Sequence, residues 1–157
     1  MPKLSLTVQY ASNAPDLPTQ AEFRKWARSA LNVDAEITLR LVDEAEGHSL
    51  NHDYRGKDYA TNVLTFALAE EPHLMGDIVL CVPVVLREAG EQNKTPDAHF
   101  AHLTVHGVLH LCGYGHETEA QAELMETLET EIVTKLGYAD PYHPDAYHLE
   151  KETAYYG

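Results

Sequence analysis

The chain has 157 residues, of which 44% are hydrophobic and 23% are charged, and its formal net charge is −14. This length fits one domain that can bury a core without disulfides, and two cysteines are too few for a disulfide framework. No stretch approaches the roughly 18 apolar residues of a membrane span, and the first residues lack the apolar region of a signal peptide. We therefore expect a cytoplasmic protein with reduced thiols and no membrane partner.

The negative charge is spread unevenly along the chain. A net charge of −14 disfavours broad, non-specific attraction to nucleic acid. Residues 117–157 hold ten acidic residues and two lysines, which gives −8 of the total. A local cationic patch is therefore possible elsewhere, and Arg55 and Lys57 are the obvious candidates for it.

The first half of the sequence alternates between strand and helix patterns. We expect strands over residues 4–10 and 36–43 and helices over residues 20–32 and 44–55. Thr19 is suited to cap the first helix, whose apolar face would consist of Phe23, Trp26, Ala27, Ala30 and Leu31. In the second helix, the inward contacts would be Ala45, Leu50 and Tyr54. The segment RGKDYATN that follows is rich in turn formers and predicts a loop.

The second half continues with two short apolar strands and three helices. We expect strands over 63–69 and 77–82, a loop between them, and helices over 83–92, 97–112 and 118–136. The last helix would bury a stripe of Leu124, Leu128, Ile132 and Leu136. Residues 138–157 show no periodicity, so we expect a poorly ordered or surface-lying acidic tail. The pattern predicts a single α+β domain with a small mixed four-stranded sheet packed against about five helices.

The segment HGVLHLCGYGH contains the candidate metal ligands of this sequence. His106 and His110 are four residues apart, which places both imidazoles on one helix face. Gly113 is suited to end the helix in a left-handed conformation, so that the chain can turn back and bring His116 to the same ion. Three neutral nitrogen ligands leave the fourth position of a tetrahedral zinc open for water, as a catalytic site requires. The spacing therefore predicts one zinc ion per chain.

Other readings of this segment remain open. With ten histidines in the chain, such a spacing can arise by chance. His102 extends the row by one turn and is expected to lie behind the ligands or merely in the core, and Cys112 is expected to be a core thiol. The spacing also matches the metalloprotease pattern H-E-x-x-H-x-x-G-x-x-H except for Gly107, which stands where those peptidases carry their general base. A peptidase is therefore the weaker alternative.

Three blocks of sequence resemble the YbeY-type endoribonucleases, a family of rRNA maturation factors. HGVLHLCGYGH is similar to the family's HGxLHLxGYDH, YRGKDYATNVLTFAL to its arginine, KD and T-D-V-L-S-F pattern, and GDIVLCVP to its GDI strand. The blocks cover about residues 50–137. The resemblance implies a metal-dependent endoribonuclease domain over residues 1–137, followed by the tail 138–157.

The resemblance also implies substrates, partners and site residues. The substrate would be single-stranded RNA, with roles in 16S rRNA 3′-end maturation and ribosome quality control, and the ribosome or its proteins would be partners. His106, His110 and His116 would be the zinc ligands, with His110 and Arg55 as catalytic residues. A guanidinium near the zinc could hold a phosphate bidentately and stabilise charge on its oxygens. The alternative for Arg55 is a surface ion pair with Asp53 or Asp58.

The sequence departs from the family pattern at several positions. Gly115 replaces the aspartate that precedes the third histidine, and Asn62 and Thr65 replace an acidic and a hydroxyl residue upstream. Glu117 is adjacent and could compensate for Gly115. Three functions therefore remain to be tested. The first is a zinc-dependent ribonuclease, in which water or the ribose 2′-hydroxyl attacks the phosphate. The second is a zinc peptidase-like hydrolase with another base, such as Glu117, and the third is a non-catalytic ribosome-associated protein whose fold is stabilised by zinc.

Overall fold

A computed structural model describes residues 2–70 and 73–142 of the chain. Its elements follow the expected order, with four strands and five helices in the described residues. They are β1 (Leu4–Ala11), α1 (Gln20–Ser29), β2 (Ala35–Val42), α2 (Glu44–Arg55), β3 (Val63–Ala69), β4 (Leu74–Cys81), α3 (Val82–Glu91), α4 (Pro96–Leu111) and α5 (Glu119–Lys135). The predicted α+β class, mixed sheet and helix count are confirmed.

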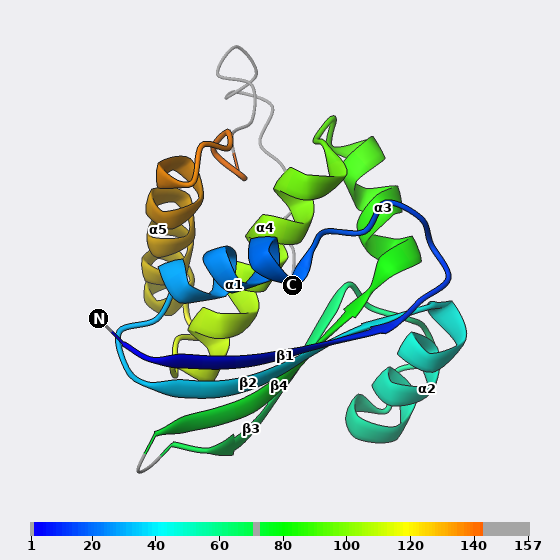
Figure 1. Cartoon of the computed structure of the whole chain (residues 1–157), viewed down its shortest axis with the longest axis horizontal. Coiled ribbons are helices and arrows are strands. Elements are labelled where there is room, and N and C mark those ends of the chain that lie inside the picture. The colour runs from blue at the N-terminus through cyan, green and yellow to red at the C-terminus, as the bar shows by residue number, and fades with distance from the viewer. Residues whose placement is uncertain (1, 71–72, 143–157) are drawn as a thin grey trace.

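The strands form one sheet in the order β1-β2-β4-β3. β1 pairs parallel to β2, β2 pairs parallel to β4, and β3 is antiparallel to β4. The sheet is seen edge-on in Figure 1, with α1, α4 and α5 on one side and α2 on the other. β4 begins three residues earlier than predicted, because Leu74 and Gly76 still pair with β2; part of the predicted loop is therefore strand.

Helix α4 lies at the centre of the main core. Twelve of its residues are buried, and it contacts α1, α3, α5 and the strands β3 and β4. Gly107 lets the helix approach the sheet, since a Cβ atom there would lie 3.1 Å from the side chain of Ile78 on β4. A side chain at position 107 would therefore be directed at the sheet, which gives a structural reason why the peptidase glutamate is absent.

The first helix buries the predicted face, whereas two other helices do not. Phe23, Trp26, Ala27, Ala30 and Leu31 are all buried. In α2, however, Ala45 and Tyr54 are exposed, and the buried positions are Gly47 and Asn51. Close contact explains the difference, because a Cβ atom at Gly47 would lie 2.8 Å from the Cys81 sulfur. The prediction for Ala45 and Tyr54 is therefore wrong.

Helix α5 also presents a different face from the predicted one. Met125, Glu129 and Val133 are its buried residues, while Leu124 is half exposed. Leu128, Ile132 and Leu136 are partly buried against the core, so the prediction is wrong for Leu124 only. The inward-facing glutamate becomes important below.

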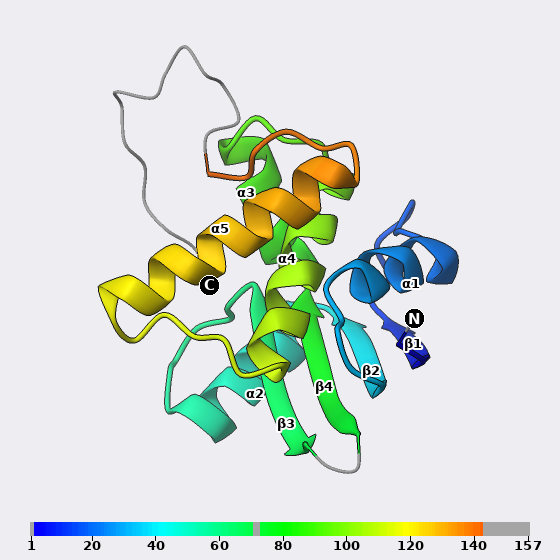
Figure 2. The ribbon, with the colours of Figure 1, turned by 90° about the vertical axis from the view of Figure 1, so that its left-hand side faces the viewer.

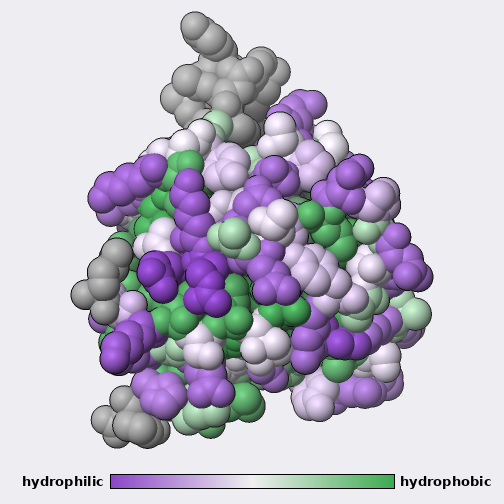
Figure 3. All heavy atoms as spheres, viewed as in Figure 1, coloured by the Kyte–Doolittle hydropathy of each residue, from purple (hydrophilic) through white to green (hydrophobic). Residues whose placement is uncertain are grey.

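Two further features concern the surface and the tail. Hydrophobic side chains are interspersed with hydrophilic ones on the face shown in Figure 3. No described helix is long and apolar enough to cross a membrane. Of the predicted tail, residues 143–157 lie outside the described residues, and Tyr142 is buried.

Candidate metal centre

Helix α4 carries four histidines on one face. Thr95 caps the helix by accepting a hydrogen bond from the Ala98 amide at 3.1 Å, and Pro96 occupies the first turn. The histidines follow at helical spacing, at positions 99, 102, 106 and 110. Sequence alone therefore places them in a row along the helix, and the structure decides which of them face each other.

The chain reverses direction after the helix, as predicted. Gly113 has φ +103°, a conformation that L side chains rarely adopt. Its amide donates to the His110 carbonyl at 3.0 Å, and the Tyr114 amide donates to the Leu109 carbonyl at 3.1 Å. This turn brings His116 back beside the end of α4, just before Thr118 caps α5.

His106, His110 and His116 come together in space. One ring nitrogen of each lies within 4.8 Å of those of the other two, and the Nε2 atoms of His110 and His116 are 3.5 Å apart. Two nitrogens bound tetrahedrally to one zinc at about 2.0–2.1 Å would be about 3.3–3.4 Å apart. Within the described residues, this is the one group of histidine, cysteine or carboxylate side chains whose ligand atoms lie close enough together to bind one metal ion. The donor set and spacing fit zinc.

Glu129 of α5 holds one of these histidines in place. Its Oε2 accepts a hydrogen bond from His106 Nδ1 at 2.8 Å, which leaves His106 Nε2 free to bind a metal. Its Oε1 accepts from His102 Nε2 at 2.6 Å and from the Tyr142 hydroxyl. Burial raises the pKa of Glu129, but the hydrogen bonds from His102 and His106 outweigh it and lower the pKa to about 2. Glu129 is therefore an ionised carboxylate shared by three donors.

The remaining candidates lie outside the ligand group. His102 is buried, its Nε2 is used by Glu129, and burial lowers its pKa to about 4, so it is a neutral, buried residue outside the three-histidine group. Cys112 is half buried against the core, and burial raises the pKa of its thiol. Burial, together with His106 and His116, also lowers the pKa of His110. A lowered pKa favours the neutral imidazole that binds metal.

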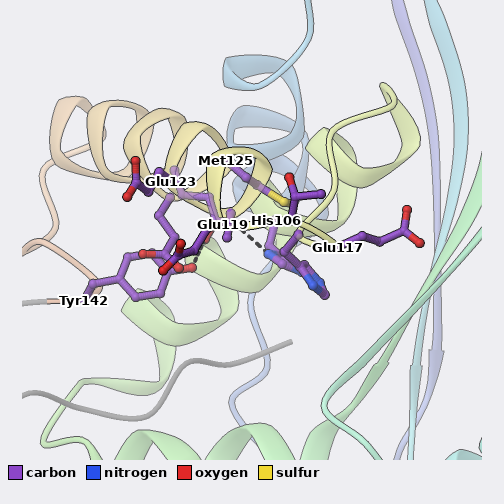
Figure 4. A pocket seen from close by; sticks show the side chains of 11 residues that line it. His106, Glu117, Glu119, Glu123, Met125 and Tyr142 are labelled. Carbon is purple, nitrogen blue, oxygen red and sulfur yellow. Dashed lines mark hydrogen bonds and ion pairs between the residues drawn. The ribbon is translucent and has the colours of Figure 1, made fainter.

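The three histidines lie between two hollows. The β3-side hollow, about 420 Å³, is also lined by Tyr54, Arg55, Thr65 and Phe66. The α5-side hollow, about 510 Å³, is lined by His106 and His116 together with Glu117, Glu119, Glu123 and Tyr142, and Figure 4 shows these residues. Figure 2 places α5 and β3 on different sides of the end of α4.

Arg55 is the last residue of α2 and is brought to the β3-side hollow by the fold. The α2 helix ends at Gly56, whose φ is +69°. The expected alternative for Arg55 was an ion pair with a nearby aspartate. In the described structure those aspartates instead pair with histidines, Asp53 with His52 and Asp58 with His48. Arg55 faces the same hollow as His110, and its charge is one of the influences that lower the His110 pKa.

The positions that depart from the family pattern have different surroundings. Asn62 is buried and donates to Glu88 at 3.0 Å, so its amide belongs to the core. Thr65 lines the β3-side hollow. Apart from its two chain neighbours, Gly115 has no heavy atom of the described structure within 4 Å of the position of a Cβ atom, and Glu117 lines the α5-side hollow. The space at Gly115 would therefore admit a side chain without a clash.

Sequence reasoning missed Glu129 and Tyr142. The signal for Glu129 is an acidic residue within an apolar series at helical spacing, Met125, Glu129 and Val133. A buried carboxylate needs partners, and the histidine row supplies them. No comparable signal marks Tyr142, which lies in the segment expected to be a tail.

The chain folds into an α+β domain in which three histidines converge next to an arginine. It therefore belongs to the class of small proteins with a candidate hydrolytic metal site. The sequence matches the family described as "Endoribonuclease YbeY" over residues 8–137. The chain belongs to this family.

Individual relatives agree with the family match. A protein named "Endoribonuclease YbeY" from Methylobacillus flagellatus is 66% identical, covering 90% of this chain and 95% of that protein. Another of that name, from Aromatoleum aromaticum, is 61% identical over 89% of this chain and 93% of its own length. The solution structure of a Thermotoga maritima protein has a TM-score of 0.53 and 26% identity, covering 83% of this chain and 91% of that one.

Proposed function

We propose that this chain is a metal-dependent endoribonuclease that cleaves single-stranded RNA, with zinc bound by His106, His110 and His116. The observation that carries the proposal is the convergence of three histidine nitrogens in a hollow that also contains Arg55. Zinc held there would supply a Lewis acid for the phosphate and would lower the pKa of water. Membership in the YbeY family supports RNA as the substrate.

In this proposal Glu129 orients a zinc ligand, whereas Arg55 binds the substrate phosphate. Glu129 fixes the His106 ring so that Nε2 faces the other two histidines. Arg55 provides a planar guanidinium that binds a phosphate through two parallel hydrogen bonds and stabilises charge on its oxygens. Both Arg55 and the ligand His110 face the β3-side hollow. We therefore assign Arg55 and His110 to catalysis, with His110 acting as a ligand.

The wider role follows from the family and the net charge. We propose that the catalytic domain spans residues 1–137 and that the substrate is rRNA, including the 16S rRNA 3′ end. A protein of net charge −14 attracts polyanions weakly by itself. The ribosome or a ribosomal protein would therefore present the RNA, and we expect the protein to act in the cytoplasm. We assign no catalytic role to the acidic tail, residues 138–157, of which the first part packs on this domain through the buried Tyr142, a hydrogen-bond donor to Glu129.

The test is cleavage of a single-stranded RNA with the sequence of an rRNA 3′ end. Wild type and His110→Ala are assayed with and without a chelator, followed by zinc add-back. His73→Ala is the matched control, because His73 is a half-exposed histidine that pairs with Glu36 at 3.6 Å, outside the three-histidine cluster. We expect cleavage by wild type and His73→Ala, restored by zinc after chelation, and at least a 1000-fold loss in His110→Ala.

Two outcomes would contradict this function. Equal cleavage in every reaction would indicate a contaminating nuclease. No cleavage of this RNA by zinc-loaded wild type, either free or on ribosomal subunits, would favour a protein in which zinc only stabilises the fold; in that case the His110→Ala variant would show a lower melting temperature.

A further inference from the structure

The two hollows beside the histidine cluster have opposite electrostatic character. The α5-side hollow carries four glutamates, Glu117, Glu119, Glu123 and Glu126, in addition to Glu129. The β3-side hollow carries Arg55, and no carboxylate is among its described lining residues. Because like charges repel and RNA carries one negative charge per phosphate, a strand that reaches the cluster is expected to lie along the β3-side hollow.

The β3-side hollow also contains an exposed aromatic ring. Tyr54 immediately precedes Arg55 at the end of α2, and both line this hollow. The Tyr54 side chain is 67% exposed. Its ring contacts Phe66 of β3 at a centroid distance of 5.0 Å and an interplanar angle of 67°. This edge-to-face contact braces the ring while most of its surface stays free.

An exposed ring beside a phosphate-binding arginine has the chemistry to bind a nucleobase. Proteins bind unpaired nucleotides by stacking bases on aromatic side chains next to cationic groups that contact the backbone. A base within a duplex is already stacked on both faces and cannot offer one to a protein ring unless it is flipped out. A stacking site here would therefore select single-stranded over double-stranded RNA.

We propose that Tyr54 is a stacking platform for one unpaired nucleobase next to the phosphate bound by Arg55. The proposal rests on the proposed ribonuclease function and adds a substrate-binding residue to it. Tyr54 would contribute to substrate binding and to the preference for single strands, not to the chemical step. Phe66 would act through Tyr54, by holding the orientation of its ring.

The chain offers a matched control for this residue. Tyr59 is also an exposed tyrosine, at 57%, in the loop that follows α2. It is absent from the described lining of the β3-side hollow, and its backbone carbonyl accepts a hydrogen bond from the Asn51 side chain at 2.6 Å. Substitution of the Tyr59 side chain should therefore leave RNA binding and cleavage unchanged.

The experiment measures binding and cleavage separately for Tyr54→Ala, Tyr54→Phe and Tyr59→Ala, each loaded with zinc. Binding is followed by fluorescence anisotropy with a labelled, 2′-O-methyl and phosphorothioate-protected single strand, and with the corresponding duplex. Cleavage of the unmodified strand gives kcat and KM. Circular dichroism establishes that each variant is folded, which is expected because Tyr54 is exposed.

The expected pattern follows from loss of one stacked base. Tyr54→Ala should weaken single-strand binding and raise KM by about 5- to 100-fold, with kcat changed less than about threefold. Tyr54→Phe keeps the ring and should stay within about threefold of wild type. Duplex binding should not change, and Tyr59→Ala should match wild type throughout.

Several results would overturn the proposal. Unchanged single-strand affinity in Tyr54→Ala, or an equal loss in Tyr54→Phe, would show that the ring does not stack on a base. A fall in kcat with unchanged binding would assign Tyr54 to the chemical step. Failure of the ribonuclease function itself would appear as wild type that cleaves nothing, and the anisotropy titration with protected RNA would still test Tyr54 in that case.

Discussion

The two halves of the histidine row on α4 use the same residue type for different purposes. In the sealed half, His99 and His102 are buried, and each directs Nε2 to a carboxylate: His99 to Glu88 at 2.8 Å and His102 to Glu129 at 2.6 Å. In the open half, His106 gives Nδ1 to Glu129 and keeps Nε2 free, and His110 is only half buried.

The difference indicates which histidines of the row can bind a metal and which are structural. All four residues share one helix face at spacings of three or four residues, so helix geometry does not distinguish them. The ring nitrogen that a carboxylate occupies does distinguish them, because a nitrogen that already donates a hydrogen bond cannot also bind a metal. His99 and His102 keep only Nδ1, which is buried outside the three-histidine group, whereas His106 keeps Nε2 and belongs to that group. The open half also faces the cationic Arg55, whereas the sealed half faces Glu88, and Glu129 contacts both halves.

Among variants that keep the three histidines, the largest expected effect comes from Arg55, which faces the open half. Arg55→Ala removes the group that we propose stabilises charge on the phosphate, so we expect kcat/KM to fall by about 10²–10³-fold. The zinc content should remain that of wild type, because Arg55 is not a ligand. Arg28→Ala, an exposed arginine at the end of α1, should cleave normally. Unchanged cleavage by Arg55→Ala would remove Arg55 from the mechanism.

Glu129 accepts hydrogen bonds from His102 in the sealed half and from His106 in the open half, so Glu129→Gln affects both halves. The amide cannot accept all the hydrogen bonds from His102, His106 and Tyr142, and it carries no charge. We expect a loss of about 3 kcal/mol in the free energy of unfolding of the apo-protein, measured by urea denaturation. Zinc affinity should fall by about 10–100-fold, measured by competition with a chromophoric chelator. Weakened stability with unchanged zinc affinity would contradict a role in positioning His106.

Acid should weaken the sealed half of the apo-protein. The pKa of His102 is lowered to about 4 from its usual 6.5, so between these values the unfolded chain binds a proton that the native chain does not. Stability is therefore full above pH 6.5 and falls as the pH decreases toward 4, by at most about 3 kcal/mol from His102. Urea denaturation across this range measures the effect.

The control for the acid effect is His102→Gln, which keeps an N–H donor for Glu129 but cannot be protonated. Its stability should depend less on pH between 4 and 6.5 than that of wild type. The same pH dependence in both proteins would show that His102 is not the titrating group.

The smallest effect concerns a buried cation near the sealed half. Lys94 Nζ is buried without a hydrogen-bond partner in the described structure, and burial lowers the pKa of Lys94 to about 8. Lys94→Met should therefore increase the free energy of unfolding by about 1 kcal/mol at pH 7. The gain should shrink between pH 8 and 10.5, where the native lysine becomes neutral. Lys135→Met, at an exposed position of α5, should show neither change.

Much of the fold and the histidine cluster could be predicted from sequence, because both depend on local signals. Helical spacing joins His106 to His110, and Gly113 ends the helix so that His116 can return. Alternating and apolar runs marked all four strands. The partner on α5 could not be found in this way, because two apolar series compete on that helix, and tertiary contact selects the one that contains Glu129.

The orientation of α2 shows the same limit. Periodicity placed Tyr54 inward, but the helix packs through Gly47 and leaves Tyr54 on the surface beside Arg55. Close packing on a glycine is a property of two elements together, here α2 and the Cys81 end of β4, and a single stretch of sequence does not contain it.

The most direct test of the central claim is the zinc content of His106→Ala and His102→Gln after dialysis against zinc, measured by plasma mass spectrometry on folded protein. Both residues are bound to Glu129 on the same helix face, but only His106 belongs to the three-histidine group; the remaining ring nitrogen of His102, Nδ1, is buried outside it. We predict one zinc per chain in wild type and His102→Gln, and essentially none in His106→Ala. A full complement of zinc in His106→Ala, or its loss from folded His102→Gln, would contradict the assignment of the open half as the metal site.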